Sequence, residues 1–337
     1  MMYPNAVTAP FKEVQPGLFH PAPLATLPPD SGCHFELYLG LPWRMGRRYI
    51  LFKAADTELT MKKRQQLMEN GVTTLYVRDD DAGVYYEFVD RTIGQVLASE
   101  KTSYEEKSKV LYQTSYALVR STFERPQSPM LIATNEKMVT HTVSMLAAEP
   151  TVLRTMVSLF AFDYSLYTHS VHVAVLGTGL LLDSRSHTAE TAKNMAMGFL
   201  LHDIGKSRVP ADIVRKPGML TPWEIRQMEK HPDFGAGLMQ SHETIHPHAL
   251  EIIQNHHESL DGSGYPRHLT ADAQSLETRV CCVADVFDAL TSHRVYKPAM
   301  RAYDAIQNMM TRMKEKLDQD IVEHLIHQLG PNATRSV

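Results

Sequence analysis

The feature that most constrains this chain is an aspartate inside an apolar helical run. Asp285 lies within Val280–Phe287, and all the remaining residues of this segment are apolar. A carboxylate on a buried helix is costly unless a partner neutralises it, and a metal ion is one such partner. The fold must therefore bring a cation, together with its other ligands, to this helix.

Histidines at the ends of other helical runs supply such ligands. The chain has 17 histidines, and five of them stand at or near helix ends: His169, His202 followed by Asp203, His231, and His256 followed by His257. Each of these histidines alone is more often structural than a ligand. Five histidines and two aspartates are about twice what one ion needs, and they suit two metal ions about 3.5–4 Å apart. Imidazole and carboxylate ligands fit iron, manganese, nickel and zinc alike.

The residues around these ligands suggest a phosphate-containing substrate. Gly205 is expected to end the helix that carries His202 and Asp203. The loop Asp261–Pro266, here called the GYP loop, follows His257 closely and would present Tyr265 as a platform or hydrogen-bond donor. Four cations are candidates for cradling phosphate oxygens: Lys206, Lys216, Arg294 and Lys297. Asp288, one turn after Asp285, would contact a base or sugar or orient a ligand.

Composition excludes several classes of protein. The net charge of −4 argues against a protein that coats DNA, because such proteins carry basic stripes. Three cysteines form no disulfide framework, and the first residues do not resemble a signal peptide, so we expect a cytoplasmic protein. The longest apolar stretch, Val173–Leu182, is about half of what a membrane-spanning helix needs.

The pattern divides the chain into an α+β N-terminal module over residues 1–95, a helical connection over 96–150 and an all-α domain over 151–337. In the module, which we expect to be regulatory, a helix is predicted over Thr60–Glu69. Strands are predicted over Phe35–Leu39, Tyr49–Lys53, Thr74–Val77 and Val84–Val89. In the helical part, Thr221–Glu224 has the pattern of a capping box.

Four motifs together resemble the HD-GYP family, a branch of the HD-domain phosphohydrolases. They are His202–Lys206 (HDIGK), His256–Glu258 (HHE), the GYP loop Asp261–Pro266 and Ala284–Ser292 (ADVFDALTS). The resemblance runs from about Asp163 to Tyr303. It implies an all-helical HD-type fold and a metal-dependent hydrolysis of cyclic di-GMP to linear pGpG, and in some members on to GMP, by a metal-activated hydroxide.

The resemblance also implies roles for individual residues. The metal ligands would be His169, His202, Asp203, His231, His256, His257 and Asp285, with Asp203 bridging two ions, iron or manganese before nickel or zinc. Lys206 would touch the scissile phosphate and, with Asp203, carry catalysis. The nucleotide would contact Tyr265, Asp288, Arg294 and Lys297. Where some family members have a glutamate that binds a third ion, this chain has Ser165, so we expect two ions.

Two alternatives remain open at this point. The substrate is cyclic di-GMP or 3′3′-cyclic GMP-AMP, which the contact residues do not separate. The second alternative is that the protein is a non-catalytic receptor for cyclic dinucleotides. In either case the GYP loop is the expected docking surface for a protein partner such as a diguanylate cyclase domain, and a homodimer is a further expectation.

Overall fold

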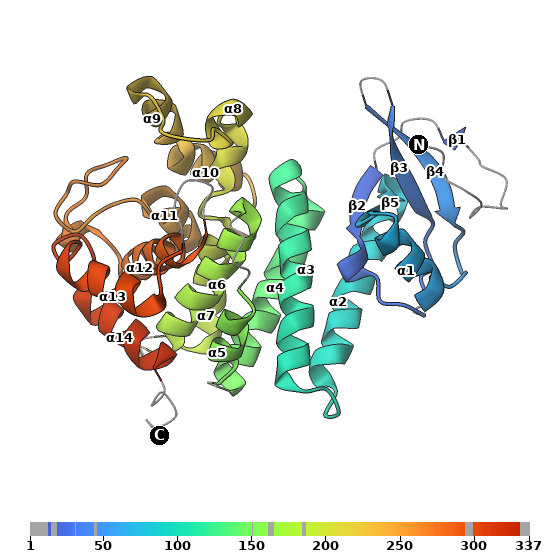
Figure 1. Ribbon diagram of the computed structural model, residues 1–337, viewed down its shortest axis with the longest axis horizontal. Coiled ribbons are helices and arrows are strands. Elements are labelled where there is room, and N and C mark those ends of the chain that lie inside the picture. The colour runs from blue at the N-terminus through green and yellow to red at the C-terminus, as the bar shows by residue number, and fades with distance from the viewer. Residues whose placement is uncertain are drawn as a thin grey trace. The chain divides into compact units, whose positions relative to one another are not determined.

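The structure is a computed structural model of the 337-residue chain. It describes residues 13–14, 19–30, 32–43, 46–149, 151–160, 165–183, 187–293 and 299–330. The chain forms two compact units, residues 1–100 and residues 101–337 (Figure 1). Within the described residues, none of the helices combines the length and the hydropathy that a membrane crossing requires.

The first unit is an antiparallel sheet with two helices. The strands follow the order β1-β4-β3-β5-β2 and comprise β1 (Glu13–Val14), β2 (Phe19–Pro23), β3 (Leu37–Trp43), β4 (Gly46–Lys53) and β5 (Thr74–Arg78). Helix α1 (Met61–Glu69) begins at Thr60, whose side chain accepts from the backbone of Lys63. The helix ends at Asn70, before Gly71 in the left-handed region. These bounds confirm the predicted helix.

One predicted strand of this unit is wrong. Residues Val84–Val89 lie in helix α2 (Ala82–Ala98), which follows a short 3-10 turn over Asp79–Asp81. The buried residues Tyr85, Phe88 and Val89 recur at helical spacing, and the rings of Tyr85 and Phe88 pack against Phe35, which precedes β3. A short apolar run does not distinguish a buried strand from a buried helix face, and the carboxylates that precede α2 favour a helix N-terminus.

Within the described residues, the regular elements of the second unit are all helices. Its α-helices are α3 (Tyr104–Glu124), α4 (Pro129–Ala148), α5 (Thr151–Ser158), α6 (Leu166–Asp183), α7 (Ala189–Leu201), α8 (Ala211–Val214), α9 (Pro222–Met228), α10 (His231–Met239), α11 (Pro247–Asn255), α12 (Leu276–Thr291), α13 (Ala302–Thr311) and α14 (Gln319–Leu329). The helices α3 and α4 pack against α5, α6 and α7, so they are part of this unit. The capping box predicted at Thr221 is present at the start of α9.

Helix α6 forms the centre of the second unit. Residues 168–181 are all buried, because α6 is covered by α7 and α12 and also contacts α3, α4, α5 and α14 (Figure 1). A helix that is apolar on every side is one that the fold buries on every side. His169 at its first turn therefore lies inside the protein, where it contacts Asp285 and Asp288 of α12.

Gly205 has a different role from the one predicted. Helix α7 ends at Leu201, and Gly205 lies inside the 3-10 helix η3 (Ile204–Arg208) without a positive φ. A Cβ at Gly205 would lie 1.9 Å from the carbonyl oxygen of His231 and 2.5 Å from the backbone nitrogen of Gly235. The glycine thus allows α10 to approach η3, which brings His231 close to Asp203.

We expect Gly205→Ala to lower the free energy of unfolding by about 3 kcal/mol or more, because the added methyl group meets rigid backbone atoms. Gly237→Ala on α10 is the matched control. A Cβ there meets nothing within 4 Å, and alanine favours helix by about 1 kcal/mol. Urea unfolding followed by circular dichroism measures both variants. Equal stability of the two would show that η3 and α10 separate easily.

Candidate metal centre

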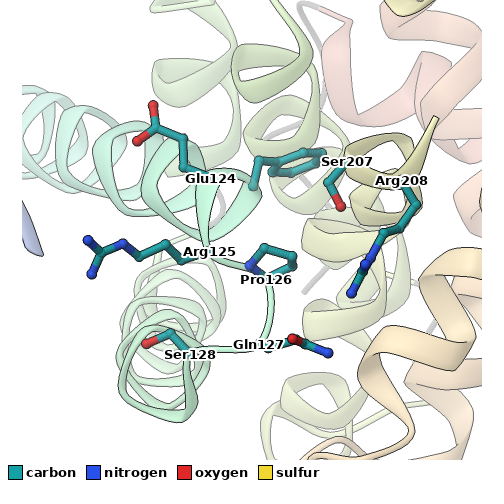
Figure 2. Close-up of a pocket in the computed structure, with 8 residues that line it drawn as sticks. Glu124, Arg125, Pro126, Gln127, Ser128, Ser207 and Arg208 are labelled. Carbon is teal, nitrogen blue, oxygen red and sulfur yellow. The ribbon is translucent and has the colours of Figure 1, made fainter. Parts of the chain in front are cut away.

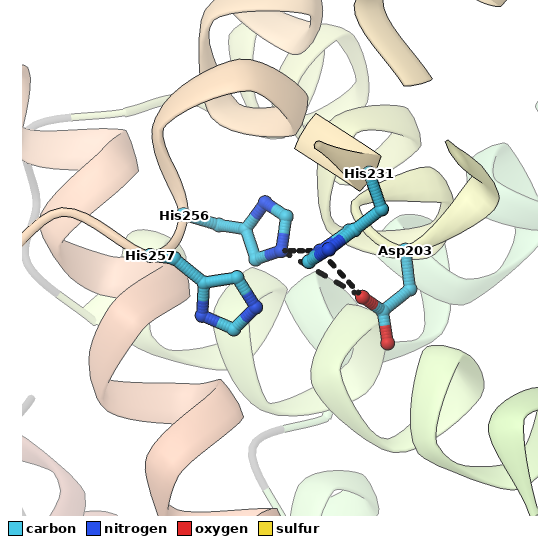
Figure 3. A group of neighbouring side chains, drawn as sticks. All are labelled: Asp203, His231, His256 and His257. Carbon is cyan, nitrogen blue, oxygen red and sulfur yellow. Dashed lines mark hydrogen bonds and ion pairs between the residues drawn. The ribbon is translucent and has the colours of Figure 1, made fainter. Parts of the chain in front are cut away.

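Asp203 lies at the centre of a buried cluster, between the end of α7 and the start of η3 (Figure 3). Its Oδ1 is 3.2 Å from Nε2 of His231 and 3.7 Å from Nε2 of His256. Its Oδ2 is 3.5 Å from Nε2 of His202 and 2.6 Å from Nζ of Lys206. The two oxygens of one carboxylate therefore face two different sets of histidines.

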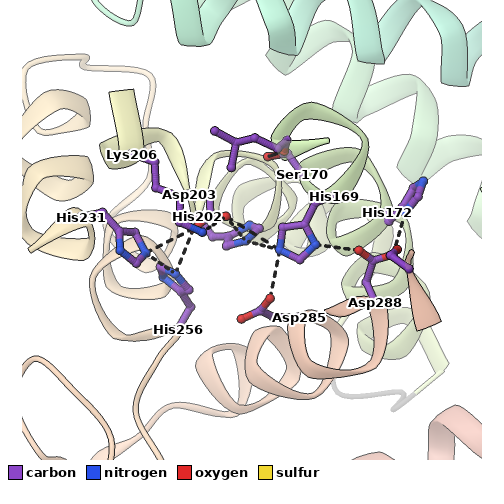
Figure 4. Close-up of polar contacts among 12 residues, drawn as sticks. His169, Ser170, His172, His202, Asp203, Lys206, His231, His256, Asp285 and Asp288 are labelled. Atoms are coloured by element: carbon purple, nitrogen blue, oxygen red, sulfur yellow. Dashed lines mark hydrogen bonds and ion pairs between the residues drawn. The ribbon is translucent and has the colours of Figure 1, made fainter. Parts of the chain in front are cut away.

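These sets form two groups of ligand atoms that share Asp203. One group is His169, His202 and Asp203, and the other is Asp203, His231, His256 and His257; in each group the ligand atoms lie within 4.8 Å of one another. Asp285 of α12 stands between the groups, with Oδ1 3.0 Å from Nε2 of His169 and Oδ2 3.7 Å from Nδ1 of His257 (Figure 4). The structure thus brings all seven predicted ligands together.

Backbone carbonyls orient three of the imidazoles. His202, His231 and His256 each contact, through Nδ1, the carbonyl three residues earlier in the chain. The contacts are with Phe199 at 2.8 Å, Met228 at 2.7 Å and Ile253 at 2.9 Å. An Nδ1–H that donates to a carbonyl leaves Nε2 unprotonated in the neutral ring, so the lone pair of Nε2 is directed into the cluster.

The cluster fits divalent cations and is poorly satisfied without them. The Nε2 atoms of His231 and His256 are 3.1 Å apart, and those of His169 and His202 are 3.2 Å apart. Two lone pairs at such a distance repel each other unless a cation or a proton lies between them. Oδ1 of Asp203 is also buried without a hydrogen bond. Imidazole nitrogens around a shared carboxylate are a donor set that first-row divalent metals bind.

The pKa directions give the ligand states that metals require. Burial lowers the pKa of His231, lowers that of His256 to about 4 and, with the neighbouring His256, holds the pKa of His257 well below its usual range. Burial acts to raise the pKa of Asp203, but Lys206 and His202 outweigh it and hold that pKa well below the usual range. Neutral imidazoles beside an ionised carboxylate are therefore the resting state at neutral pH.

The GYP loop is attached directly to the cluster. Its backbone N–H at Tyr265 donates to the carbonyl of His257 at 3.1 Å, and the Tyr265 ring lies 4.8 Å from the His257 ring. A Cβ at Gly264 would lie 2.5 Å or less from the backbone of residues 257–259. The buried carboxylate of Glu258 accepts from the backbone of Arg267 at 2.6 Å and of Leu269 at 2.9 Å. Tyr265 is thus held beside the candidate metal ligands, as its position in the sequence predicts.

Asp288 is not where a nucleotide contact is expected. The side chain is buried, with Oδ2 2.7 Å from Nδ1 of His169 and Oδ1 2.6 Å from Nδ1 of His172 (Figure 4). The predicted contact with a base or sugar is therefore corrected, since both oxygens are engaged by histidines. The other predicted role, orienting a ligand, matches this geometry. His172 was missed, although its spacing from His169 equals that of Asp288 from Asp285.

The predicted cations differ in their surroundings. Lys206 pairs with Asp203 at the half-buried edge of the cluster. Lys216 lies 2.6 Å from Glu224 and thereby joins the capping box of α9. Arg294 and Lys297 fall outside the described residues. Ser165 accepts through Oγ from the backbone of Thr168 at 3.0 Å, which is a helix-capping contact at the start of α6.

A surface hollow of about 440 Å³ lies elsewhere in the second unit. It is lined by residues 123–128, which comprise the end of α3 and the loop to α4, and by Ser207 and Arg208 of η3 (Figure 2). None of the seven clustered residues lines this hollow. This hollow therefore lies apart from the candidate metal-binding residues.

The chain is similar to known proteins over the part that holds this cluster. Residues 165–321 match the HD domain family. A cyclic di-GMP phosphodiesterase of Pseudomonas aeruginosa is 36% identical over 160 residues, 48% of this chain and 38% of the relative. A cyclic di-GMP phosphodiesterase response regulator of Xanthomonas campestris is 37% identical over 163 residues, 44% and 43% of the two chains. A 3′3′-cGAMP-specific phosphodiesterase of Vibrio cholerae is 36% identical over 127 residues, 37% and 24% of the two chains.

The fold is shared over a longer stretch. The solved structure of Bd1817, an HDG"Y"P protein from Bdellovibrio bacteriovorus, superimposes with a TM-score of 0.69 at 17% identity and covers 91% of this chain and 98% of that one. The chain spans less than half the length of the three curated relatives that it matches. The chain thus matches the HD domain family over residues 165–321, and this stretch holds both the GYP loop and the clustered histidines and aspartates.

Proposed function

We propose that this protein is a metal-dependent phosphodiesterase that hydrolyses cyclic dinucleotides, with cyclic di-GMP as the first candidate substrate and linear pGpG as its product. The observation that carries the proposal is the sharing of one buried carboxylate, Asp203, by two groups of histidines. Pairs of divalent ions recur in the active sites of enzymes that hydrolyse phosphate esters. The names of the relatives supply both candidates, cyclic di-GMP and 3′3′-cyclic GMP-AMP.

One ion would be held by His169, His202, Asp203 and Asp285, and the other by Asp203, His231, His256 and His257. We favour iron or manganese over nickel or zinc, although this donor set admits all four. When bound, the ions supply Lewis acidity to the phosphodiester and lower the pKa of water. Because no third group of ligands adjoins the described part of the cluster, two ions are proposed.

The hydrolysis consumes one water molecule. The oxygen of water forms a bond to phosphorus, the bond between phosphorus and a ribose 3′ oxygen breaks, and that 3′ oxygen leaves as a hydroxyl that carries one proton from water. The product is linear and keeps its phosphate on the 5′ side. A second cleavage of the same kind would give GMP.

The residues of the chain would bind the substrate and orient its phosphate. Lys206 stands at the edge of the cluster, where its ammonium group can pair with a phosphate oxygen and offset charge that develops there. Tyr265 presents its ring beside His257, where a base or ribose would lie against it. Burial raises the pKa of the Tyr265 phenol, so it remains a hydrogen-bond donor at neutral pH.

A non-catalytic receptor is the second candidate function. In that case the same cluster would bind metal and cyclic dinucleotide without turnover, and the exposed positions of the GYP loop, Asp261 and Ser263, would present a surface to a protein partner such as a diguanylate cyclase domain. The complete set of ligands favours the enzyme, since a receptor does not need a carboxylate shared between two ion positions.

The proposed activity is tested on protein purified without oxygen and loaded with Fe²⁺ or Mn²⁺. Cyclic di-GMP and 3′3′-cyclic GMP-AMP are supplied in parallel, and the products are separated by chromatography. We expect a linear dinucleotide from at least one substrate, and no product after chelation of the metal. Binding of a substrate without any product, at full metal content, would replace the enzyme by the receptor.

Replacement of the shared carboxylate is the sharpest test of the site. We expect Asp203→Asn to lower kcat by about 100-fold or more, because the amide keeps the shape but removes the charge that two ions share. Asp212→Asn, at an exposed position on α8, is the matched control and should leave kcat unchanged. Metal content is measured by mass spectrometry on the same samples. Full activity in Asp203→Asn would rule out the bridging role.

A further inference from the structure

A chain of hydrogen-bonding groups lies behind His169, on the side away from the cluster. Asp288 of α12 contacts Nδ1 of His169 at 2.7 Å through one oxygen and Nδ1 of His172 at 2.6 Å through the other. Nε2 of His172 in turn lies 2.9 Å from the hydroxyl of Tyr112 on α3. Three helices thus contribute to one connected path that ends on a predicted metal ligand. Figure 4 shows its part from His172 through Asp288 to His169.

The direction of each hydrogen bond follows from its acceptors. The carboxylate of Asp288 can only accept when it is ionised, so both histidines donate to it through Nδ1. The pKa of Asp288 is held below its usual range, because His169 and His172 outweigh the effect of burial. With a proton on Nδ1, neutral His172 offers Nε2 as an acceptor to the Tyr112 hydroxyl. Each hydrogen bond therefore sets the direction of the next. With its proton on Nδ1, neutral His169 has an unprotonated Nε2, which faces the cluster.

Packing holds the middle of this path rigid. The His172 ring is 1% exposed and stacks on the Phe160 ring, with 3.7 Å between centroids and 10° between planes. The hydroxyl of Ser292 donates to Asp288 at 3.2 Å, which gives the Oδ1 atom a second donor. A buried, fully bonded network of this kind orients its members more sharply than apolar contacts do. Little freedom remains for the carboxylate or for the imidazole that it holds.

We propose that Tyr112 and His172 are positioning residues that act through Asp288 to fix His169 for one of the two metal ions. The inference rests on the ion-binding part of the proposed function. In this proposal, α3 directly affects one ion position. This helix is the first of the second unit along the chain. The second ion position, which His231, His256 and His257 supply, has no part in this path.

The chain offers a matched control for Tyr112. Tyr116 lies one turn further along α3, is also half-buried, and contacts the ring of Tyr167 edge-on. Within the described residues its hydroxyl is engaged by no hydrogen bond that the structure shows. Tyr112→Phe and Tyr116→Phe therefore remove the same atom from the same helix, but only the first removes a group from the path.

The test measures metal binding by the full chain and does not depend on turnover. Metal-free protein is titrated with Mn²⁺, and the free ion is followed by electron paramagnetic resonance. The visible ligand-field spectrum of the Co²⁺-loaded protein reports the geometry of the ligands. We expect Tyr112→Phe to weaken one of two Mn²⁺ sites by about 3- to 10-fold, the effect of one hydrogen bond, and to change the Co²⁺ spectrum. Tyr116→Phe should match the wild type in both.

A second pair of variants tests the next bond. His172→Phe removes the donor to Asp288, and we expect it to weaken the same Mn²⁺ site by about 10- to 100-fold. His172→Asn keeps an N–H close to the place of Nδ1 and should recover most of that loss. Thermal unfolding is measured for each variant. If His172→Phe does not fold, the comparison of the two tyrosine variants decides alone.

Every outcome bears on the proposal. Equal Mn²⁺ affinities and spectra in Tyr112→Phe and Tyr116→Phe, or an asparagine variant no better than phenylalanine, would reduce the path to packing and overturn the positioning role. A wild-type protein that binds no Mn²⁺ would overturn both this role and the proposed function. A wild type that binds two ions and shows the tyrosine effect, yet hydrolyses nothing, would overturn the proposed function alone.

Discussion

The burial of one carboxylate, that of Asp203, constrains the arrangement of the rest of the second unit. The side chain is inaccessible to water, and an unpaired carboxylate in such a place costs several kcal/mol. This cost is offset by the ammonium group of Lys206, 2.6 Å from Oδ2 of Asp203, and by imidazoles at the end of α7, in α10 and at the end of α11. Lys206 offsets one negative charge, yet Oδ1 stays without a hydrogen bond. The site therefore still requires positive charge, which cations would supply. The helices of the second unit pack around this site.

Helix ends deliver these imidazoles because an end combines a fixed position with unused carbonyls. The last carbonyls of a helix have no intrahelical partner, and an imidazole that follows them can bond back through Nδ1. His202 and His256 use this contact at the ends of α7 and α11, and His231 uses the carbonyl of Met228, the last residue of α9. A single local rule therefore orients three ligands without help from distant side chains. His169 lies inside a helix, where no such carbonyl is free, and it relies on Asp288 instead.

The sequence predicted those features of the site that depend on residues close together in the chain. Helix-end histidines and the aspartate inside an apolar helix could be read from spacing, and the structure brings all seven together. The role of Gly205 could not be read, since the close approach of His231 involves a helix that begins 26 positions later. The strand predicted over Val84–Val89 failed because six residues do not carry enough of a period to separate the two conformations. The change from strand-like to helical patterns near residue 95 was visible in the sequence, whereas the packing of α3 and α4 into the second unit depends on tertiary contacts.

Asp288 shows how a distant contact could still have been inferred. His169 and His172 are three residues apart on α6, and Asp285 and Asp288 are three residues apart on α12, so each pair occupies one helix face. Two helices that pack with these faces together form two matched His–Asp contacts, His169 with Asp285 at 3.0 Å and His172 with Asp288 at 2.6 Å. His169 then meets both aspartates, one on the metal side and one behind. The same spacing on both helices places one aspartate among the candidate metal ligands and the other behind His169, so the register of α6 on α12 decides which carboxylate faces the cluster.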